Sequence, residues 1–237
     1  MGLYTQGSRQ PKIGAFIPGT IQRLAWAPLW ALFGLFGSFE VKGHRNLVGI
    51  KGPVIIASNH ISELDPLLIV AALPFFSRHI PLFYVSREKG FYKVNWRSAV
   101  YGGNFFKMMG AYPGYKGLND YERALQHHLG VLRHGKSVGI FPMGGIRPRG
   151  EPLQPKGGVI YLAHATNAPI IPVSITGAEN LSLNDFFGRK RKIRLVFGQP
   201  IYAQELLEQP TIEITEKSYS ECEAAAKILM NKITKLR

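Results

Sequence analysis

Short apolar runs alternate with amphipathic stretches along most of this chain. The apolar runs are rich in β-branched and aromatic residues, which is typical of strands, and they occupy positions 54–57, 81–85, 137–141, 170–175 and 193–197. Helical spacing of apolar residues marks positions 66–73, 119–134, 157–166 and 218–236. This alternation predicts an α/β fold in which a single mixed sheet is covered by helices.

The amino-terminal part follows a different pattern. Positions 21–39 are apolar and aromatic, but Pro28 interrupts the run, which argues against a helix that spans a membrane. Trp26 and Trp30 are spaced so that they share one helical face. A broken apolar helix of this kind is typical of a segment that lies among lipid headgroups. We therefore expect residues 1–40 to be an interfacial membrane anchor, the alternative being that its aromatic side chains pack against the protein's own core.

Charge narrows the choice of partners. The chain has 29 Lys and Arg against 15 Asp and Glu, a formal charge of +14, which favours partners that carry phosphate. Nucleic acid and anionic lipid both fit this description. The basic run at 188–194 is accompanied by no recognition helix and no aromatic RNA motif, so we expect membrane lipids and an anionic bilayer surface, and no nucleic acid.

Cysteine and histidine usage limits the other possibilities. Cys222 is the only cysteine, which excludes an internal disulfide framework and a multi-cysteine metal site. The histidines show no ligand spacing, so we expect no metal. Positions 1–12 lack the pattern of an export signal. Together these features predict a monotopic, membrane-associated protein on the cytoplasmic face of the inner or plasma membrane.

The most informative segment is VIIASNHISELDPLL, in which an apolar strand is followed by a turn and a helix. Asp65 before Pro66 is a good helix start, because Asp can cap free amides and proline suits the first helical position. His60 then lies in the turn, from which the carboxylate of Asp65 can reach its ring. A carboxylate that accepts from one ring nitrogen leaves the other free to take a proton from an alcohol. A capping Asp beside a surface His is the plainer interpretation of the same residues.

Several blocks in order resemble the lysophosphatidic acid acyltransferase family of glycerolipid acyltransferases. NHISELD matches that family's N-H-x4-D motif, and GAYPGYK at 110–116 resembles its second block, with Lys116 where the family usually has Arg. FPMGG at 141–145 resembles the third block, and PIIPVSITG at 169–177 the fourth. The likeness covers residues 41–201, which makes 41–237 the expected acyltransferase domain.

The resemblance implies a reaction and roles for individual residues. His60 is expected to act as general base on the acceptor hydroxyl, with Asp65 orienting it. Lys116 and Arg147 are expected to bind the acceptor's phosphate, together with the Gly-rich turn at Gly144 and Gly145, where backbone can approach an anion closely. The acyl donor would be acyl-CoA or acyl carrier protein, used as co-substrate, and no cofactor is expected.

Met143 is the main departure from the family pattern, because the third block normally has Glu at this position. A thioether can neither pair with Arg nor accept a charged hydrogen bond strongly. We assign position 143 to the acceptor site and keep three interpretations open: an adapted acceptor site, an impaired lipid-binding homologue, or a deliberately introduced substitution.

Overall fold

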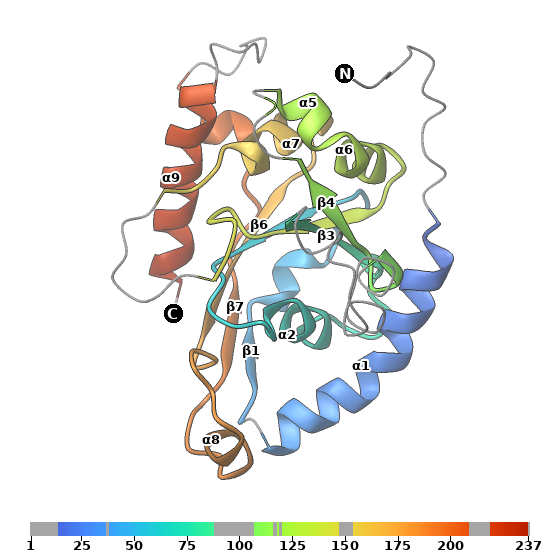
Figure 1. The fold of residues 1–237 in the computed structure, drawn as a ribbon, viewed down its shortest axis with the longest axis vertical. Coiled ribbons are helices and arrows are strands. Elements are labelled where there is room, and N and C mark those ends of the chain that lie inside the picture. The colour runs from blue at the N-terminus through green and yellow to red at the C-terminus, as the bar shows by residue number, and fades with distance from the viewer. Residues whose placement is uncertain are drawn as a thin grey trace.

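A single β-sheet forms the centre of the fold (Figure 1). The computed structural model describes residues 14–36, 38–87, 107–115, 118, 120–146, 154–208 and 219–236. Within these residues the strands lie in the order β1 (Glu40–Lys42), β7 (Arg194–Phe197), β6 (Ile170–Thr176), β2 (Ile55–Ser58), β5 (Ser137–Ile140), β3 (Leu82–Arg87) and β4 (Ala111–Gly114). Only the pair β6 and β7 is antiparallel, so the predicted mixed sheet is confirmed.

The central strands β2, β5 and β6 are almost completely buried. Helices cover both faces of the sheet, so these strands are mainly apolar along their whole length rather than alternating with polar residues. Successive side chains point to opposite faces: Ile55 and Ala57 join one apolar cluster, and Val54 and Ile56 join the other. All five predicted strands are present, with boundaries shifted by at most two residues.

The two edge strands were not predicted. β1 has three residues, two of them charged, and β4 contains Pro113, which cannot donate to a ladder. Each forms because one buried neighbour supplies its partner groups: β7 pairs with β1, and β3 pairs with β4. Their strand character therefore comes from the sheet rather than from their own composition.

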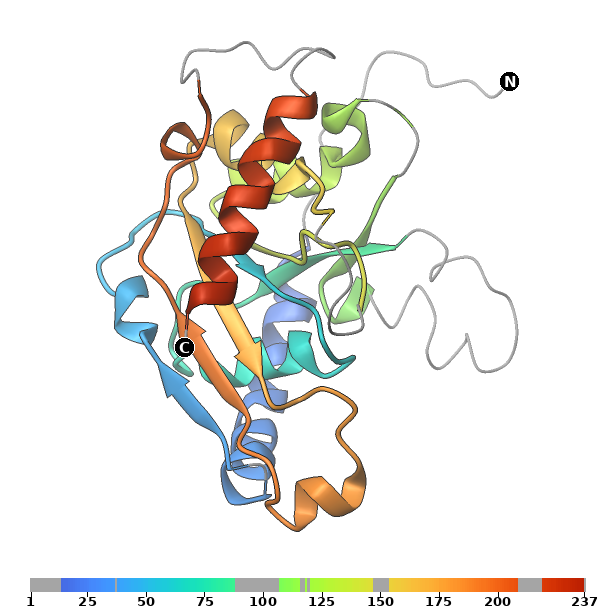
Figure 2. The same cartoon turned by 90° about the vertical axis from the view of Figure 1, so that its left-hand side faces the viewer.

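Helices form a layer on each face of the sheet (Figure 2). One layer contains α5 (Tyr121–Ala124), α6 (Gln126–Arg133), α7 (Gly158–Thr166), α9 (Tyr219–Lys235) and the short 3-10 turn η3 (Ala203–Glu205). The other contains α1 (Phe16–Phe36), α2 (Asp65–Ala72), the turn η1 (His44–Leu47) and α8 (Leu183–Phe187). The stretch expected as one helix at 119–134 is two, because Leu125 leaves helical backbone angles at φ −120° and ψ 16°.

The expected break at Pro28 is wrong, because α1 continues through it. Proline removes one backbone hydrogen bond and crowds the preceding turn, which bends a helix without necessarily ending it. Figure 1 shows α1 bending along its length. Pro28 is exposed, so the solvent side of the helix accommodates the lost bond.

One face of α1 is fixed to the core by polar contacts. The amide of Gln22 donates to Leu82 O at 2.8 Å and accepts from Leu82 N at 2.8 Å, and Trp26 Nε1 donates to Leu73 O at 2.7 Å. The opposite face leaves Phe16 and Leu24 exposed. Among the described residues, no helix combines the length and hydrophobicity needed to cross a bilayer.

Candidate active site

His60 lies in the turn that leaves the carboxyl end of β2 and enters α2. Its Nδ1 is 2.8 Å from Asp65 Oδ2. The Asp65 side chain is fully buried, and the His60 side chain is 17% exposed. The structure therefore brings the two residues together and leaves the ring accessible from one side.

The carboxylate of Asp65 holds the turn as well as the ring. Oδ2 accepts from Ile61 N at 2.7 Å and from Ser62 N at 3.0 Å in addition to the His60 contact. No side-chain bond caps the first amides of α2, so the capping role expected of Asp65 is corrected: it binds amides of the turn before the helix. Oδ1 is buried without a hydrogen-bond partner among the described residues.

This geometry sets the tautomer of the ring. A carboxylate oxygen only accepts, so Nδ1 of His60 must carry the hydrogen, and Nε2 of a neutral ring is then the acceptor. Within the described residues Nε2 has no hydrogen-bond partner, and the ring is partly exposed. The arrangement can therefore take a proton from a hydroxyl group that approaches Nε2.

Asn59 ties the same turn to the neighbouring strand. Its Nδ2 donates to Ile175 O at 2.8 Å, and its Oδ1 accepts from Ile175 N at 2.8 Å. The side-chain amide thus continues the pairing of β2 with β6 for one step beyond Ser58, the last residue of β2. Because His60 follows Asn59 directly, this pair of bonds fixes where the histidine leaves the sheet.

Aromatic rings support His60 from behind. The ring of Phe141 is stacked on the His60 ring with centroids 4.1 Å apart, and the Tyr84 ring is nearly parallel to Phe141 at 6.2 Å. The Tyr84 hydroxyl donates to Pro66 O at 2.8 Å, in the first turn of α2. Burial, and then the nearby charge of Asp65, hold the pKa of Tyr84 well above its usual value, so this hydroxyl stays a donor.

A glycine makes room for this stack. A Cβ at Gly139 would lie 2.4 Å from Cε1 of Tyr84, closer than any two such atoms can approach. Gly139 lies in β5 opposite Tyr84 in β3, so the Tyr84 ring occupies the place that a side chain at 139 would take. The position of the ring beneath Phe141 therefore depends on glycine at 139.

The FPMGG turn follows β5 directly. Met143 is buried, 6% exposed, in the apolar cluster under α6, α7 and α9. Gly144 has φ +69°, a backbone angle that favours glycine, and the methylene groups of Lys156 lie beside it. Gly145 is buried. The acceptor-binding roles of these positions stay predictions.

Lys116 and Arg147 lie outside the described residues, so their predicted role in phosphate binding also stays a prediction. Sequence reasoning missed Asn59, Tyr84 and the contact of Phe141 with His60. Asn59 and Phe141 stand inside the NHISELD and FPMGG blocks, and that position was the available signal. Tyr84 had none, because it is an ordinary strand residue in sequence.

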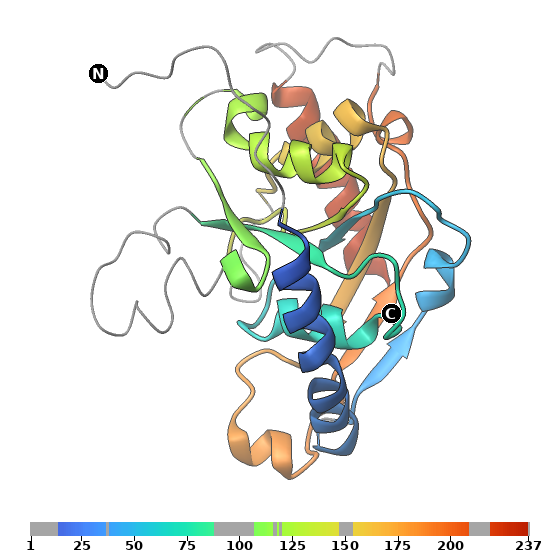
Figure 3. The same cartoon turned by 90° about the vertical axis from the view of Figure 1, so that its right-hand side faces the viewer.

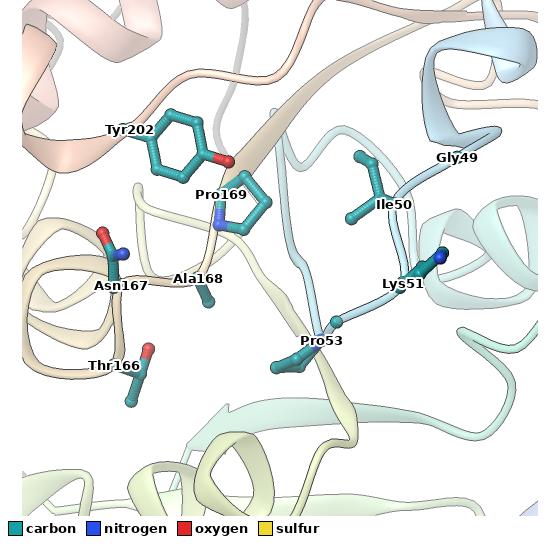
Figure 4. Close-up of a pocket in the computed structure, with 10 residues that line it drawn as sticks. Gly49, Ile50, Lys51, Pro53, Thr166, Asn167, Ala168, Pro169 and Tyr202 are labelled. Carbon is teal, nitrogen blue, oxygen red and sulfur yellow. The ribbon is translucent and has the colours of Figure 1, made fainter.

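A separate pocket of about 400 Å³ lies at the amino ends of β2 and β6 (Figure 4). Pro53 and Pro169, which precede β2 and β6, line it, together with Lys51, Asn167 and Tyr202. His60 follows the other end of β2, so this pocket is no part of the candidate active site. The described residues contain no cluster of His, Cys, Asp and Glu able to hold a metal ion.

Comparison with known proteins places these features in a family context. The Acyltransferase family model matches residues 38–176. A probable 1-acyl-sn-glycerol-3-phosphate acyltransferase of Mycoplasma genitalium is 27% identical over 132 residues, 54% of this chain and 46% of that protein. A 1-acyl-sn-glycerol-3-phosphate acyltransferase of Borreliella burgdorferi is 27% identical over 203 residues, 82% of this chain and 70% of that protein. The matched region is thus about half the length of the Mycoplasma relative.

A solved structure has the same fold. The crystal structure of the 1-acyl-sn-glycerophosphate (LPA) acyltransferase PlsC from Thermotoga maritima superposes with a TM-score of 0.57 at 19% sequence identity. The match covers 92% of this chain and 83% of that one. It supports the α/β architecture with one sheet flanked by helices.

Proposed function

Because this chain belongs to the acyltransferase family, we propose that it moves a fatty acyl group from acyl-CoA or acyl carrier protein to the free hydroxyl of lysophosphatidate or a related lysolipid. Such a reaction is a step of phospholipid biosynthesis. The resemblance drawn from the sequence blocks is confirmed at the level of the family. The observation that carries the proposal is the contact of His60 Nδ1 with the buried Asp65 carboxylate at 2.8 Å.

The chemistry follows from that contact. Nε2 of His60 takes the proton of the acceptor hydroxyl while the oxygen attacks the thioester carbonyl carbon. The new C–O bond forms, the C–S bond breaks, and the imidazolium returns the proton to the departing thiolate. The negative charge of Asp65, whose side chain is fully buried, stabilises the imidazolium in between.

The acceptor's phosphate is assigned to cationic and backbone groups near this turn. Lys116 and Arg147 supply charge in this proposal, and the turn at Gly144 and Gly145 supplies close backbone approach. Lys156 joins them, because its side chain lies alongside Gly144 in the structure. A lysolipid with a free phosphate should then be a better acceptor than the corresponding monoacylglycerol.

We further propose that the protein rests on the cytoplasmic, anionic face of a membrane through the outer face of α1. Large apolar side chains are exposed there, among them Leu24, Trp30 and Leu35. Deleting residues 1–39 would disturb folding as well as membrane contact, since Phe33 and Gln22 are buried in the core. The variant Leu24→Gln/Leu35→Gln should instead lose binding to anionic vesicles and keep its fold by circular dichroism. Unchanged cosedimentation with vesicles would contradict the proposal.

A second candidate function is lipid binding without turnover. The observation in its favour is Met143, which places a buried thioether where the family has a carboxylate. In this case the fold and the membrane surface persist, and lysolipids bind without transfer.

One assay separates the two. Thiol release from acyl-CoA is measured with a panel of lysolipids for the wild type, His60→Ala and His44→Ala, the last as a control at an exposed histidine in η1. Transfer requires that His60→Ala lose all turnover while His44→Ala keeps it. Full turnover by His60→Ala would contradict the role of His60 as a base. Lysolipid binding without turnover by the wild type would favour the second candidate.

A further inference from the structure

The strands β6 and β7 pair antiparallel within the sheet, and the connection between them extends beyond it. Thr176 pairs with Arg194, and the chain between them carries α8 at the far end of the molecule (Figure 2). Because β2 and β6 are parallel, with Ser58 opposite Val173, their carboxyl ends lie on the same side of the sheet. The connection after β6 and the His60 turn after β2 both leave the sheet there. This connection, residues 177–193, is called the tip below, and it lies on the same side of the sheet as the candidate active site.

The tip is anchored to α1 by one aromatic residue and exposes the next. The Phe186 ring is buried and meets the Phe33 ring of α1 edge to face, with centroids 6.0 Å apart. Phe187 is 53% exposed. Figures 1 and 3 show α8 beside the carboxyl end of α1, so the tip extends the exposed apolar surface of that helix.

The cations of the basic run divide into two groups. Lys192 Nζ and Arg194 Nε lie 3.0 Å and 2.6 Å from Glu40 Oε2. Hydrogen bonds from these two cations lower the pKa of Glu40 to about 2, so the carboxylate stays charged against them. Arg191 donates to Glu179 O at 2.5 Å and faces Asp185 at 4.0 Å. These three cations already have partners.

Arg189 and Lys190 form no ion pair within the described residues. The pKa of Asp185 is lowered first by the hydrogen bond from Ser182 and then by the charges of Arg191 and Lys190. Both side chains are exposed. Among the described residues, the Arg189 side chain reaches only Gly34 O of α1, at 3.5 Å. Two cations available for binding therefore follow the exposed ring of Phe187.

We propose that residues 186–190 are a second bilayer contact, in which Phe187 enters the headgroup region while Arg189 and Lys190 bind lipid phosphates. Aromatic rings favour the membrane interface, and each cation near an anionic surface adds to the attraction. The proposal rests on the membrane association proposed for α1 and adds a separate point of contact. The membrane contacts of α1 and of the tip are joined through Phe33 and Phe186. Together they turn the carboxyl end of β2, and with it His60, toward the bilayer from which a lysolipid arrives.

A matched pair of charge variants tests the cations. Arg189→Gln/Lys190→Gln and Arg191→Gln/Lys192→Gln remove the same charge from neighbouring positions. On vesicles of phosphatidylcholine and phosphatidylglycerol at low salt, the first variant should bind about 30-fold more weakly and the second only a few-fold. The difference should shrink at about 0.5 M salt, where exposed charges are screened. Equal losses at low salt would overturn the assignment of Arg189 and Lys190.

A labelled tip tests the insertion directly. Cys222 is the only cysteine, is buried, and has a pKa raised to about 11 by burial and two nearby glutamates, so it resists labelling. Phe187→Cys therefore carries a single environment-sensitive fluorophore, and Gln204→Cys, in η3 on the other layer, is the control. Anionic vesicles should shift the emission of the tip label to the blue and leave the control unchanged. An unshifted tip label on bound protein would refute the contact.

Catalysis is followed separately with a short-chain, water-soluble acceptor in the absence of vesicles. The tip variants should keep the wild-type rate there, because none of the changed residues belongs to the active site. A wild type that binds vesicles through the tip but transfers nothing would count against the proposed reaction and not against the tip. A tip variant that loses the soluble reaction would overturn the claim that the tip acts only at the membrane.

Discussion

Replacing Asp65 by asparagine changes one atom of a buried carboxylate to an amide nitrogen. The wild-type Oδ2 accepts three hydrogen bonds, from His60 Nδ1, Ile61 N and Ser62 N. An NH2 group at that place would face two backbone N–H groups, so the amide must put its oxygen there. Its NH2 then occupies the place of Oδ1, which is buried without a partner among the described residues. The His60 ring therefore keeps its tautomer, and its hydrogen bond to residue 65 loses only the charge of the acceptor.

The size of the effect follows from this geometry. A hydrogen bond to a charged group contributes about 1 to 1.5 kcal/mol more than one between neutral groups. Two unit charges about 4 Å apart attract by about 4 kcal/mol at an effective dielectric constant of 20, and we take this energy as the upper limit of the effect. Since about 1.4 kcal/mol equals tenfold in rate, Asp65→Asn should slow transfer by about 10-fold to 1,000-fold. The buried NH2 should also lower the free energy of unfolding by about 1 to 3 kcal/mol.

Initial rates of thiol release at saturating acyl-CoA measure the effect. Asp65→Ala should be slower than Asp65→Asn, because it also releases the ring and leaves the amides of Ile61 and Ser62 unpaired. Asp120→Asn is the control, since Asp120 caps α5 at the surface and Asn caps equally well. A rate for Asp65→Asn equal to that of Asp65→Ala would mean that the amide turns its NH2 to His60. An unchanged rate would mean that the charge plays no part.

Three other substitutions follow from the structure. Asn59→Ala removes both bonds to Ile175, so denaturant unfolding should show a loss of about 2 kcal/mol, with a lower rate of transfer because His60 is less fixed. Met143→Glu buries a carboxylate in an apolar cluster, which raises its pKa, so its stability relative to Met143→Gln should fall as the pH rises from 5 to 8 in thermal unfolding. Burial, followed by the charge of His127, lowers the pKa of His128 to about 3, below its unfolded value. Stability should therefore be lost as the pH falls from about 6.5 toward 3, by up to about 1.4 kcal/mol per pH unit, and His128→Gln should show a flatter pH dependence in denaturant titrations.

Part of the fold could be predicted from local composition. The strands β2, β5 and β6 are buried on both faces, so most of their residues are apolar, and that pattern is visible in sequence. The amphipathic helix α9 is similar, because its buried stripe repeats with the helical period. Elements without such a local requirement, the edge strands β1 and β4, were missed. They are strands because a neighbouring strand offers unpaired backbone groups.

The candidate site divides in the same way. His60 and Asp65 are separated by one turn, so chain geometry alone brings them close. The NHISELD block identifies both of them in the sequence. Asn59 bonds Ile175, 116 positions away, and the Tyr84 ring reaches His60 only through Phe141. Those contacts require β6 and β5 to flank β2, with β3 beyond β5. The order of strands in a sheet is decided by packing of the whole chain, because any apolar strand can pair with any other. The candidate pair His60 and Asp65 could thus be identified from the sequence, whereas the distant residues that hold it follow from the order of the strands.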